Sequence, residues 1–313
     1  MKSCYHTETE EKMYIKFVVE QQYDGFKLGA CLREKYGFST TLIRRIKACD
    51  GASINGEPRH MGNFVKANDL VVISTPEKDT SEKPYELGFE PIYMDDYLYA
   101  INKPAGICMY RMYPEDDANI IAGVLAMNER LGIDDGPIRP LSRLDRDTTG
   151  IILFARFPHV QHHLQMLHGY SKEYLLITDG LPPEDYGTID LPIGKHDEKS
   201  FRMTCMPEGK PALTEYRVLD KCGDHALVLA KLHTGRTHQI RVHFLTIGCP
   251  LHGDSLYHVA SPEIRGQSLH CHRVTLKHPV TGLDVSIRAE LPPEFQAALQ
   301  VCGLHLPSHI EQI

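Results

Sequence analysis

A series of short apolar runs, rich in β-branched and aromatic residues, constrains the fold of this chain more than any other feature. Each run is bounded by Gly, Pro or Asp, which is typical of strands. The runs are YLYAINKP, GIILFAR, EYLLITDG, PALTEYRVLD, HALVLAKLHT and LDVSIRAEL. Helical patterns in the same region are fewer: ANIIAGVLAMNERLG, HVQHHLQMLHG and THQIRVHFLTIG. Many strands with few helices predict an α+β domain around a central antiparallel or mixed β-sheet.

A change in composition divides the 313 residues into two unequal parts. The stretch from Ser74 to Gly88 carries two prolines and alternating charges but no apolar periodicity. We therefore predict a small domain at residues 1–75, a linker at 76–88 and a larger domain at 89–313. The small domain is predicted to contain two helices and then a hairpin turn at Asn55-Gly56.

Positive charge gathers on the two helices predicted in the small domain. The second helix alone carries Arg44, Arg45 and Lys47. Taken by itself, this pattern indicates either a solvated helix face or a module that contacts phosphate groups.

Composition excludes several classes of protein. The formal charge of -7 gives no whole-molecule attraction to nucleic acid, so a polyanion would need a local basic patch. Nine cysteines without a Cys-x-x-Cys pair indicate reduced thiols and exclude a disulfide scaffold or a zinc ribbon. Neither a membrane-spanning apolar run nor a signal core is found, so we expect a cytoplasmic protein without a membrane partner.

Two segments place polar side chains beside strands, where a sheet core would exclude them. In SRLDRDTTG, Leu144 is predicted to point inward, leaving Arg143 and Asp145 on the opposite side. In SKEYLLITDG, alternation puts Lys172 and Tyr174 on one face of the strand. Each segment alone is more typical of a surface salt bridge or a satisfied turn than of a catalytic site.

A third segment, HTGRTHQIRVHFLTIG, joins a turn to a helix. Ile240, Phe244 and Ile247 form its apolar stripe, and Arg241 lies one step around from that stripe. An arginine in this place can hold a carboxylate ionised through a bidentate pair and fix its rotamer. The three segments together favour a catalytic site over three unrelated surface features.

These segments resemble the motifs of a known family. RLDRDTTGIILFAR resembles the Arg-Leu-Asp motif of the RluA family of pseudouridine synthases. KEYLLITDG is similar to its Lys-x-Tyr strand, and TGRTHQIRVHFLTIGCPLHGDSLY is similar to its third motif. Further matches, in order along the larger domain, are YLYAINKPAGI, GKPALTEYRVLD and LHCHRVTLKHPVTG. LIRRIKACDGASINGE and VKANDLVVIS resemble a small α/β RNA-binding fold named for a ribosomal protein.

The resemblance implies an isomerase, an intramolecular transferase that converts uridine in RNA to pseudouridine without a cofactor or metal. Asp145 matches the family's catalytic aspartate, which acts either as a nucleophile or as a base on the ribose. Arg241 matches its partner, and Arg236 is a second choice for that role and otherwise a phosphate ligand. Tyr174 would pack against the uracil, and Arg143 would enter the space left by the flipped base.

The resemblance implies RNA as the partner. We expect the protein to bind it as a monomer. Ile240 resembles the family's apolar pocket residue, although a core role fits it equally well. Lys172 and the basic helix residues Arg44, Arg45 and Lys47 are the further candidates for RNA contacts. The attached small domain is similar to the arrangement in members that modify large-subunit ribosomal RNA, so we expect 23S ribosomal RNA, with transfer RNA as the alternative.

Two other classes of function stay open. Nine of the 18 histidines lie between His225 and His278, which suggests a metal-dependent hydrolase, but His238 and His243 are five positions apart and no His-Glu-x-x-His motif occurs. The other class is a non-catalytic RNA-binding protein, because Ser142 stands where the family usually has His. An aspartate facing RNA would repel phosphate in a simple binder, so retention of Asp145 favours the enzyme.

Overall fold

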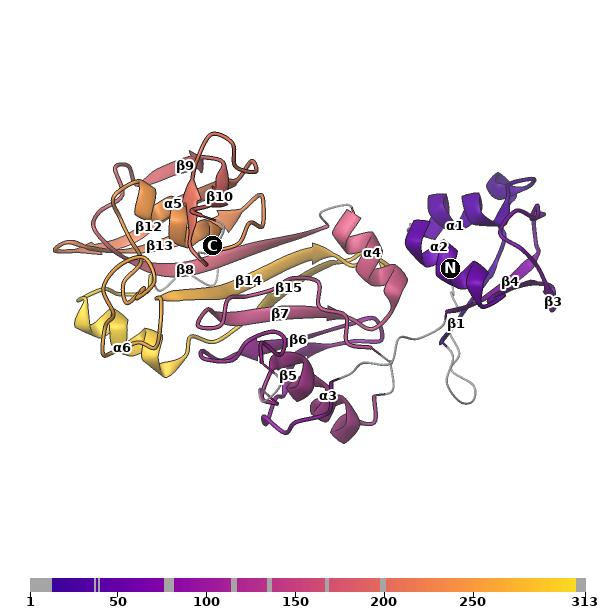
Figure 1. The fold of residues 1–313 in the computed structure, drawn as a ribbon, viewed down its shortest axis with the longest axis horizontal. Coiled ribbons are helices and arrows are strands. Elements are labelled where there is room, and N and C mark those ends of the chain that lie inside the picture. The colour runs from indigo at the N-terminus through magenta and orange to yellow at the C-terminus, as the bar shows by residue number, and fades with distance from the viewer. Residues whose placement is uncertain are drawn as a thin grey trace.

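The computed structural model describes residues 13–36, 38, 40–75, 82–113, 117–133, 137–166, 169–197 and 201–307. Two large β-sheets with separate apolar cores organise these residues (Figure 1), and residues 193–195 and 203–205 form a third sheet of two strands. One core lies between Phe17 and Ile73, and the largest core lies between Phe89 and Ala289. The predicted domain bounds stay a prediction, and residues 76–81 of the predicted linker lie outside the described residues.

The N-terminal sheet has four strands in the order β1-β4-β2-β3. The elements are β1 (Met13–Val18), the 3-10 helix η1 (Gln21–Tyr23), α1 (Leu28–Tyr36), α2 (Thr40–Ala48), β2 (Ala52–Ile54), β3 (Glu57–Pro58) and β4 (Leu70–Thr75). Asn55 and Gly56 connect β2 to β3 with φ angles of 53° and 85°. Positive φ at both positions suits a tight hairpin, so the predicted turn is confirmed.

The larger sheet has nine strands and positions the site. Its order is β5 (Pro91–Met94), β6 (Leu98–Lys103), β7 (Thr149–Ala155), β14 (Leu269–Lys277), β8 (Tyr170–Asp179), β13 (His225–Leu232), β12 (Leu213–Cys222) and β9 (Tyr186–Asp190), with β15 (Asp284–Arg288) paired to β14. Only β7 and β14 pair in parallel among the described strands, so the predicted mixed sheet is confirmed. The remaining elements are α3 (Ile120–Leu131), α4 (Pro158–Met166), β10 (Ile193–Lys195), β11 (Met203–Cys205), α5 (Gln239–Thr246) and α6 (Pro293–Val301).

No helix within the described ranges is long and apolar enough to cross a membrane.

A buried histidine joins β7 to β14 where the two strands run parallel. His270 Nδ1 lies 2.8 Å from the hydroxyl of Thr149, and its Nε2 lies 3.3 Å from the carbonyl oxygen of Ala289. The carbonyl can only accept, so Nε2 donates and Nδ1 accepts from the hydroxyl. Burial lowers the pKa of His270 to about 4, which keeps the ring neutral at pH 7.

Acid is therefore expected to destabilise the fold through His270. Between pH 6.5 and 4 the unfolded chain binds a proton that the folded ring excludes, so the free energy of unfolding falls as pH falls. From pH 6.5 to 4.5 the loss is about 2–3 kcal/mol. Urea unfolding should show a shallower acid loss in His270→Gln than in the wild type. The exposed control His305→Gln should keep the wild-type slope, and equal slopes in all three proteins would contradict the role of His270.

Candidate active site

The turn that carries Asp145 leads directly into β7. Leu144 is 7% exposed and packs in the core, whereas Arg143 is exposed and Asp145 is partly exposed, as the predicted alternation requires. Gly150 has a φ of +105°, and a Cβ added there would lie 2.3 Å from the backbone oxygen of Cys271. Glycine thus allows β7 to approach β14 closely and fixes the strand end beside the turn.

A buried lysine braces this turn. Lys103, the last residue of β6, is 0% exposed. Its Nζ donates hydrogen bonds of 2.9, 2.6 and 2.9 Å to the carbonyl oxygens of Pro104, Arg146 and Thr148. Burial lowers the pKa of Lys103 to about 8, although nearby carboxylates oppose this shift. The amine therefore ties three backbone carbonyls together beneath Asp145, one of which, that of Arg146, also accepts from the Gly106 N–H at 3.0 Å.

Arg241 holds two carboxylates at once. Its Nε and Nη2 donate to Asp254 Oδ2 and Oδ1, both at 2.7 Å, and its Nη1 donates to Asp145 Oδ2 at 3.2 Å. Arg241 is 6% exposed and Asp254 is 1% exposed. Burial alone would lower the pKa of Arg241, but the hydrogen bonds and charges of the two carboxylates raise it above its ordinary value. The bidentate pair with Asp254 thus fixes the guanidinium plane and leaves one edge for Asp145.

A histidine and a tyrosine complete the surroundings of Arg241. The guanidinium lies 5.0 Å from the ring centroid of Tyr257, whose hydroxyl accepts a hydrogen bond from the Met203 backbone and lies 2.8 Å from His238 Nδ1. When the hydroxyl donates its proton to Nδ1, the proton of a neutral His238 ring lies on Nε2. That nitrogen is 3.8 Å from Asp145 Oδ2. Burial lowers the pKa of His238, which favours this neutral form.

Strand β8 supplies a phenol and an amine on one face. Tyr174 is 3% exposed, and Lys172 Nζ lies 5.8 Å from its ring centroid. Burial, followed by the charge of Cys271, raises the pKa of Tyr174, so its hydroxyl keeps its proton at neutral pH. Burial lowers the pKa of Lys172. On the opposite face, Glu173 pairs with Arg273 at 2.5 Å.

The three polar segments meet in one pocket of about 860 Å³. This volume lies within the range of small-molecule sites. Its lining includes seven residues selected from the sequence: Arg143, Asp145, Lys172, Tyr174, Arg236, Ile240 and Arg241. Residues far apart in the chain thus present a carboxylate, a phenol and several cations to one space.

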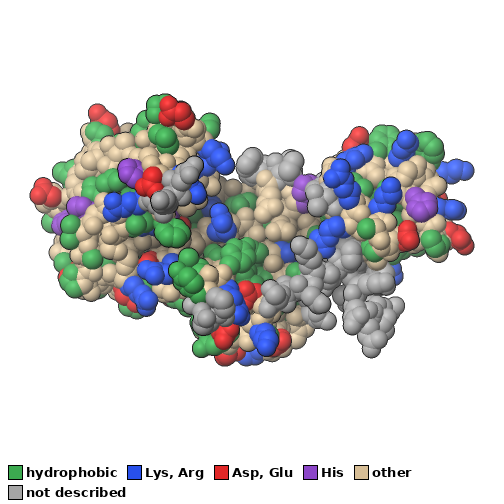
Figure 2. All heavy atoms as spheres, in the orientation of Figure 1, with side chains coloured by type: hydrophobic (Ala, Val, Ile, Leu, Met, Phe, Trp, Pro, Cys, Tyr) green, Lys and Arg blue, Asp and Glu red, His purple; other side chains and the backbone are tan. Residues whose placement is uncertain are grey.

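The remaining candidates lie at the rim or elsewhere. Arg236 is exposed and its Nε donates to the Pro211 carbonyl oxygen at 2.9 Å, so the partner of Asp145 is Arg241. The basic residues Arg44, Arg45 and Lys47 belong to α2, outside this pocket. Figure 2 shows Lys and Arg side chains gathered over the helices α1 and α2 of the N-terminal unit, which comprises the described residues from 13 to 75.

Sequence reasoning missed four residues that support the site: Lys103, His238, Asp254 and Tyr257. Asp254 and Tyr257 belong to LHGDSLY, within the third motif, and Lys103 belongs to YLYAINKP. A lysine at the end of an apolar strand was the available signal for Lys103. No periodicity indicates that Asp254 would reach back to Arg241, because the two residues are 13 positions apart across a turn.

Two of the histidines considered as metal ligands of a hydrolase make hydrogen bonds through both ring nitrogens. His243 places Nδ1 2.9 Å from the Thr214 hydroxyl and Nε2 3.0 Å from the Leu191 carbonyl oxygen. The ring nitrogens of His270 make hydrogen bonds with the Thr149 hydroxyl and the Ala289 carbonyl oxygen. These contacts support a structural role for both rings.

Comparison with known proteins agrees with this geometry. The model of the RNA pseudouridylate synthase family matches residues 97–246. An uncharacterised RNA pseudouridine synthase of Synechocystis is 34% identical over 78% of this chain and 78% of the relative. The ribosomal large subunit pseudouridine synthase D of Nitrosomonas europaea is 34% identical over 74% of this chain and 70% of the relative.

Among solved structures, human RNA pseudouridylate synthase domain containing 4 superposes with a TM-score of 0.58 at 24% identity. The match covers 70% of this chain and 94% of that protein, and it shows a shared fold. The chain belongs to the RluA-type family of RNA pseudouridine synthases.

Proposed function

We propose that this chain isomerises specific uridines in structured RNA to pseudouridine, and that its substrate is 23S ribosomal RNA. The observation that carries this proposal is the ion pair between Asp145 and Arg241 in the pocket, with Asp254 holding the arginine from its other edge. The Nitrosomonas relative is named a ribosomal large subunit synthase, and this supports the choice of RNA.

The reaction needs one carboxylate and no added group. The bond between ribose C1′ and uracil N1 breaks, the base turns, and C1′ joins C5, after which the C5 proton leaves and N1 gains one. Substrate and product are isomers, so no electrons enter. The ionised Asp145 either attacks the ribose or removes a ribose proton, and Arg241 supports both roles by holding the charge 3.2 Å away.

The uridine must leave its helix to reach Asp145, because pairing and stacking cover its glycosidic bond. Arg143 is exposed on the turn beside Asp145, and none of the ion pairs found among the described residues uses it. Its planar cation suits insertion into the space left by the base. Tyr174 then packs against the uracil, while Lys172 and Arg236 contact the phosphates beside the flipped nucleotide.

The N-terminal unit supplies a second contact with RNA. Arg44 and Lys47 are exposed on α2, beside Arg45. Because the whole chain carries a charge of -7, such a local patch is needed to attract a phosphate backbone. The protein acts as a monomer in the cytoplasm, where its ribosomal substrate is made.

Chemical mapping of pseudouridine in total RNA tests the reaction and the substrate together. Cells lacking this gene should lose one or a few sites in 23S ribosomal RNA, and the wild-type gene should restore them while Asp145→Asn should not. Loss of sites in transfer RNA instead would contradict the ribosomal substrate. If no site changes and the purified protein still binds RNA, the non-catalytic alternative linked to Ser142 is favoured.

A further inference from the structure

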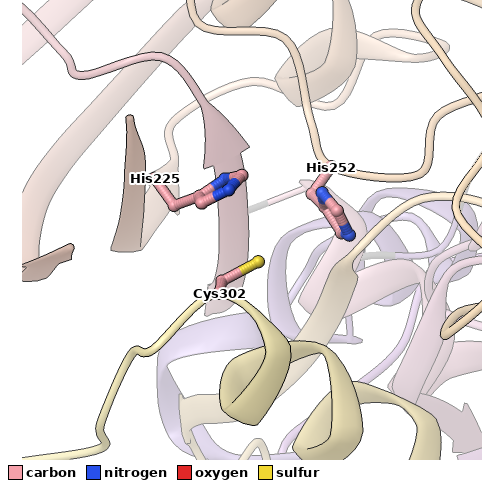
Figure 3. A group of neighbouring side chains, drawn as sticks. All are labelled: His225, His252 and Cys302. Atoms are coloured by element: carbon pink, nitrogen blue, oxygen red, sulfur yellow. The ribbon is translucent and has the colours of Figure 1, made fainter. Parts of the chain in front are cut away.

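Three side chains that can ligate a metal meet away from the pocket. They are His225 at the start of β13, His252 in the segment after α5, and Cys302 at the end of α6. One ligand atom from each lies within 4.8 Å of the other two. Figure 3 shows the Cys302 sulfur directed into the space between the two rings, whose centroids are 5.7 Å apart and whose planes cross at 88°.

A carboxylate lies beside both rings and orients that of His252. Asp179 Oδ1, at the end of β8, lies 2.8 Å from His252 Nδ1 and 3.0 Å from His225 Nδ1. His252 Nδ1 donates to this oxygen, so its Nε2 carries a lone pair. Within the described residues, His252 Nε2 is buried without a hydrogen-bond partner, and so is His225 Nδ1, whose 3.0 Å approach to Asp179 Oδ1 lacks hydrogen-bond geometry. A carboxylate behind an imidazole is the usual support of a metal-binding histidine.

The backbone around these side chains is fixed. His252 donates its N–H to the Ile177 oxygen and accepts from the Ser268 N–H, both at 2.9 Å. The N–H of Cys302 donates to the Ala298 oxygen at 3.0 Å. A site built on such elements holds its ligands in place before the ion arrives.

We propose that His225, His252 and Cys302 bind a Zn²⁺ ion, with a water molecule as the fourth ligand. Two imidazoles and one thiolate suit zinc, whereas calcium and magnesium need oxygen ligands. Zinc bond lengths place the nitrogen and sulfur ligand atoms about 3.3–3.6 Å apart, so small side-chain rotations complete the site. On binding, the Cys302 thiol becomes a thiolate and its proton passes to solvent.

This zinc site is separate from the pocket, and the proposal of zinc binding does not rest on the proposed reaction. Asp179 follows Tyr174 by five positions along β8, about 16 Å at the rise of a strand. The two sites share one segment, because His252 precedes Asp254 by two positions. A zinc ion on His252 would therefore stiffen the loop that carries the carboxylate partner of Arg241.

Metal analysis of the full-length protein tests this proposal. Protein made in zinc-supplemented medium and then desalted is expected to hold about one zinc ion per chain. His252→Gln and Cys302→Ser should each lower this to below about one tenth. Cobalt added after chelation should give a thiolate-to-cobalt absorption band in the wild type and none in Cys302→Ser. Cys49→Ser and His305→Gln, at exposed positions outside the cluster, should keep both the zinc and the band.

A third variant separates loss of zinc from loss of fold, since Cys302 is buried. His225→Gln changes a partly exposed side chain, so its circular dichroism in EDTA should equal that of the wild type while its zinc content falls. Zinc should also raise the melting temperature of the wild type and not of this variant. A wild type without zinc that gives no cobalt band, or a Cys302→Ser protein that retains both, would overturn the site.

Discussion

Replacing Asp145 with Asn is expected to abolish pseudouridine formation, with a loss of roughly a thousandfold or more, while RNA affinity stays within a few-fold. Asparagine keeps the size of the side chain and an oxygen that can accept from Arg241 Nη1, now 3.2 Å from Asp145 Oδ2. It lacks the negative charge that either role, nucleophile or base, requires. The reaction should therefore fail although the pocket still accepts its substrate.

Release of tritium from C5-labelled uridine in RNA measures turnover, because C5 loses its hydrogen when it bonds to the ribose. Filter binding measures affinity. Asp147→Asn is the matched control, since Asp147 lies in the same turn but pairs with Arg146 at 2.7 Å. It should keep activity within a few-fold. Wild-type turnover by Asp145→Asn would refute the assignment, and a parallel loss of RNA affinity would indicate a binding role instead.

Local patterns sufficed for much of the fold. GIILFAR became β7 because a short apolar run between turn residues has few alternatives to a buried strand. The helix α5 followed from the spacing of Ile240 and Phe244, and both side chains are buried. The same spacing placed Arg241 beside the packing face, where it meets Asp145. These features depend on residues close together in the sequence.

Features that depend on distant contacts were not predictable in the same way. Strand β14 lies between β7 and β8, yet its LHCHRVTLK sequence lacks a clean apolar alternation because His270 is buried through hydrogen bonds. The expectation that the protein binds no metal rested on histidine pairs at the spacings of helices and strands. The cluster of His225, His252 and Cys302 joins segments 27 to 77 positions apart, so no local spacing reveals it.

Replacing Asp254 with Ala is expected to destabilise the protein by about 3–5 kcal/mol, because a buried guanidinium loses its bidentate partner. Arg241 would keep its single hydrogen bond to Asp145 and its contact with the Tyr257 ring. The backbone N–H of Leu256, which donates to Asp254 Oδ1, would lose this acceptor as well, whereas that of Tyr257 would keep its bond to the Asp254 backbone oxygen. Urea unfolding at pH 7 measures the change. Asp284→Asn, on an exposed position of β15, is the control and should shift stability by less than about 0.5 kcal/mol.

The milder Asp254→Asn separates positioning from stability. The amide keeps one acceptor for Arg241, so the fold should survive, but the guanidinium loses the second strong bond that fixes its plane. A displaced Arg241 should lower kcat by about 10- to 100-fold with KM nearly unchanged, because the substrate does not touch Asp254. The double variant Asp145→Asn/Asp254→Asn should be no slower than Asp145→Asn alone, since Asp254 acts on catalysis only through the charge at position 145. Additive losses in the double variant would show that Asp254 contributes by another route, and an unchanged kcat in the single variant would show that Arg241 keeps its geometry without it.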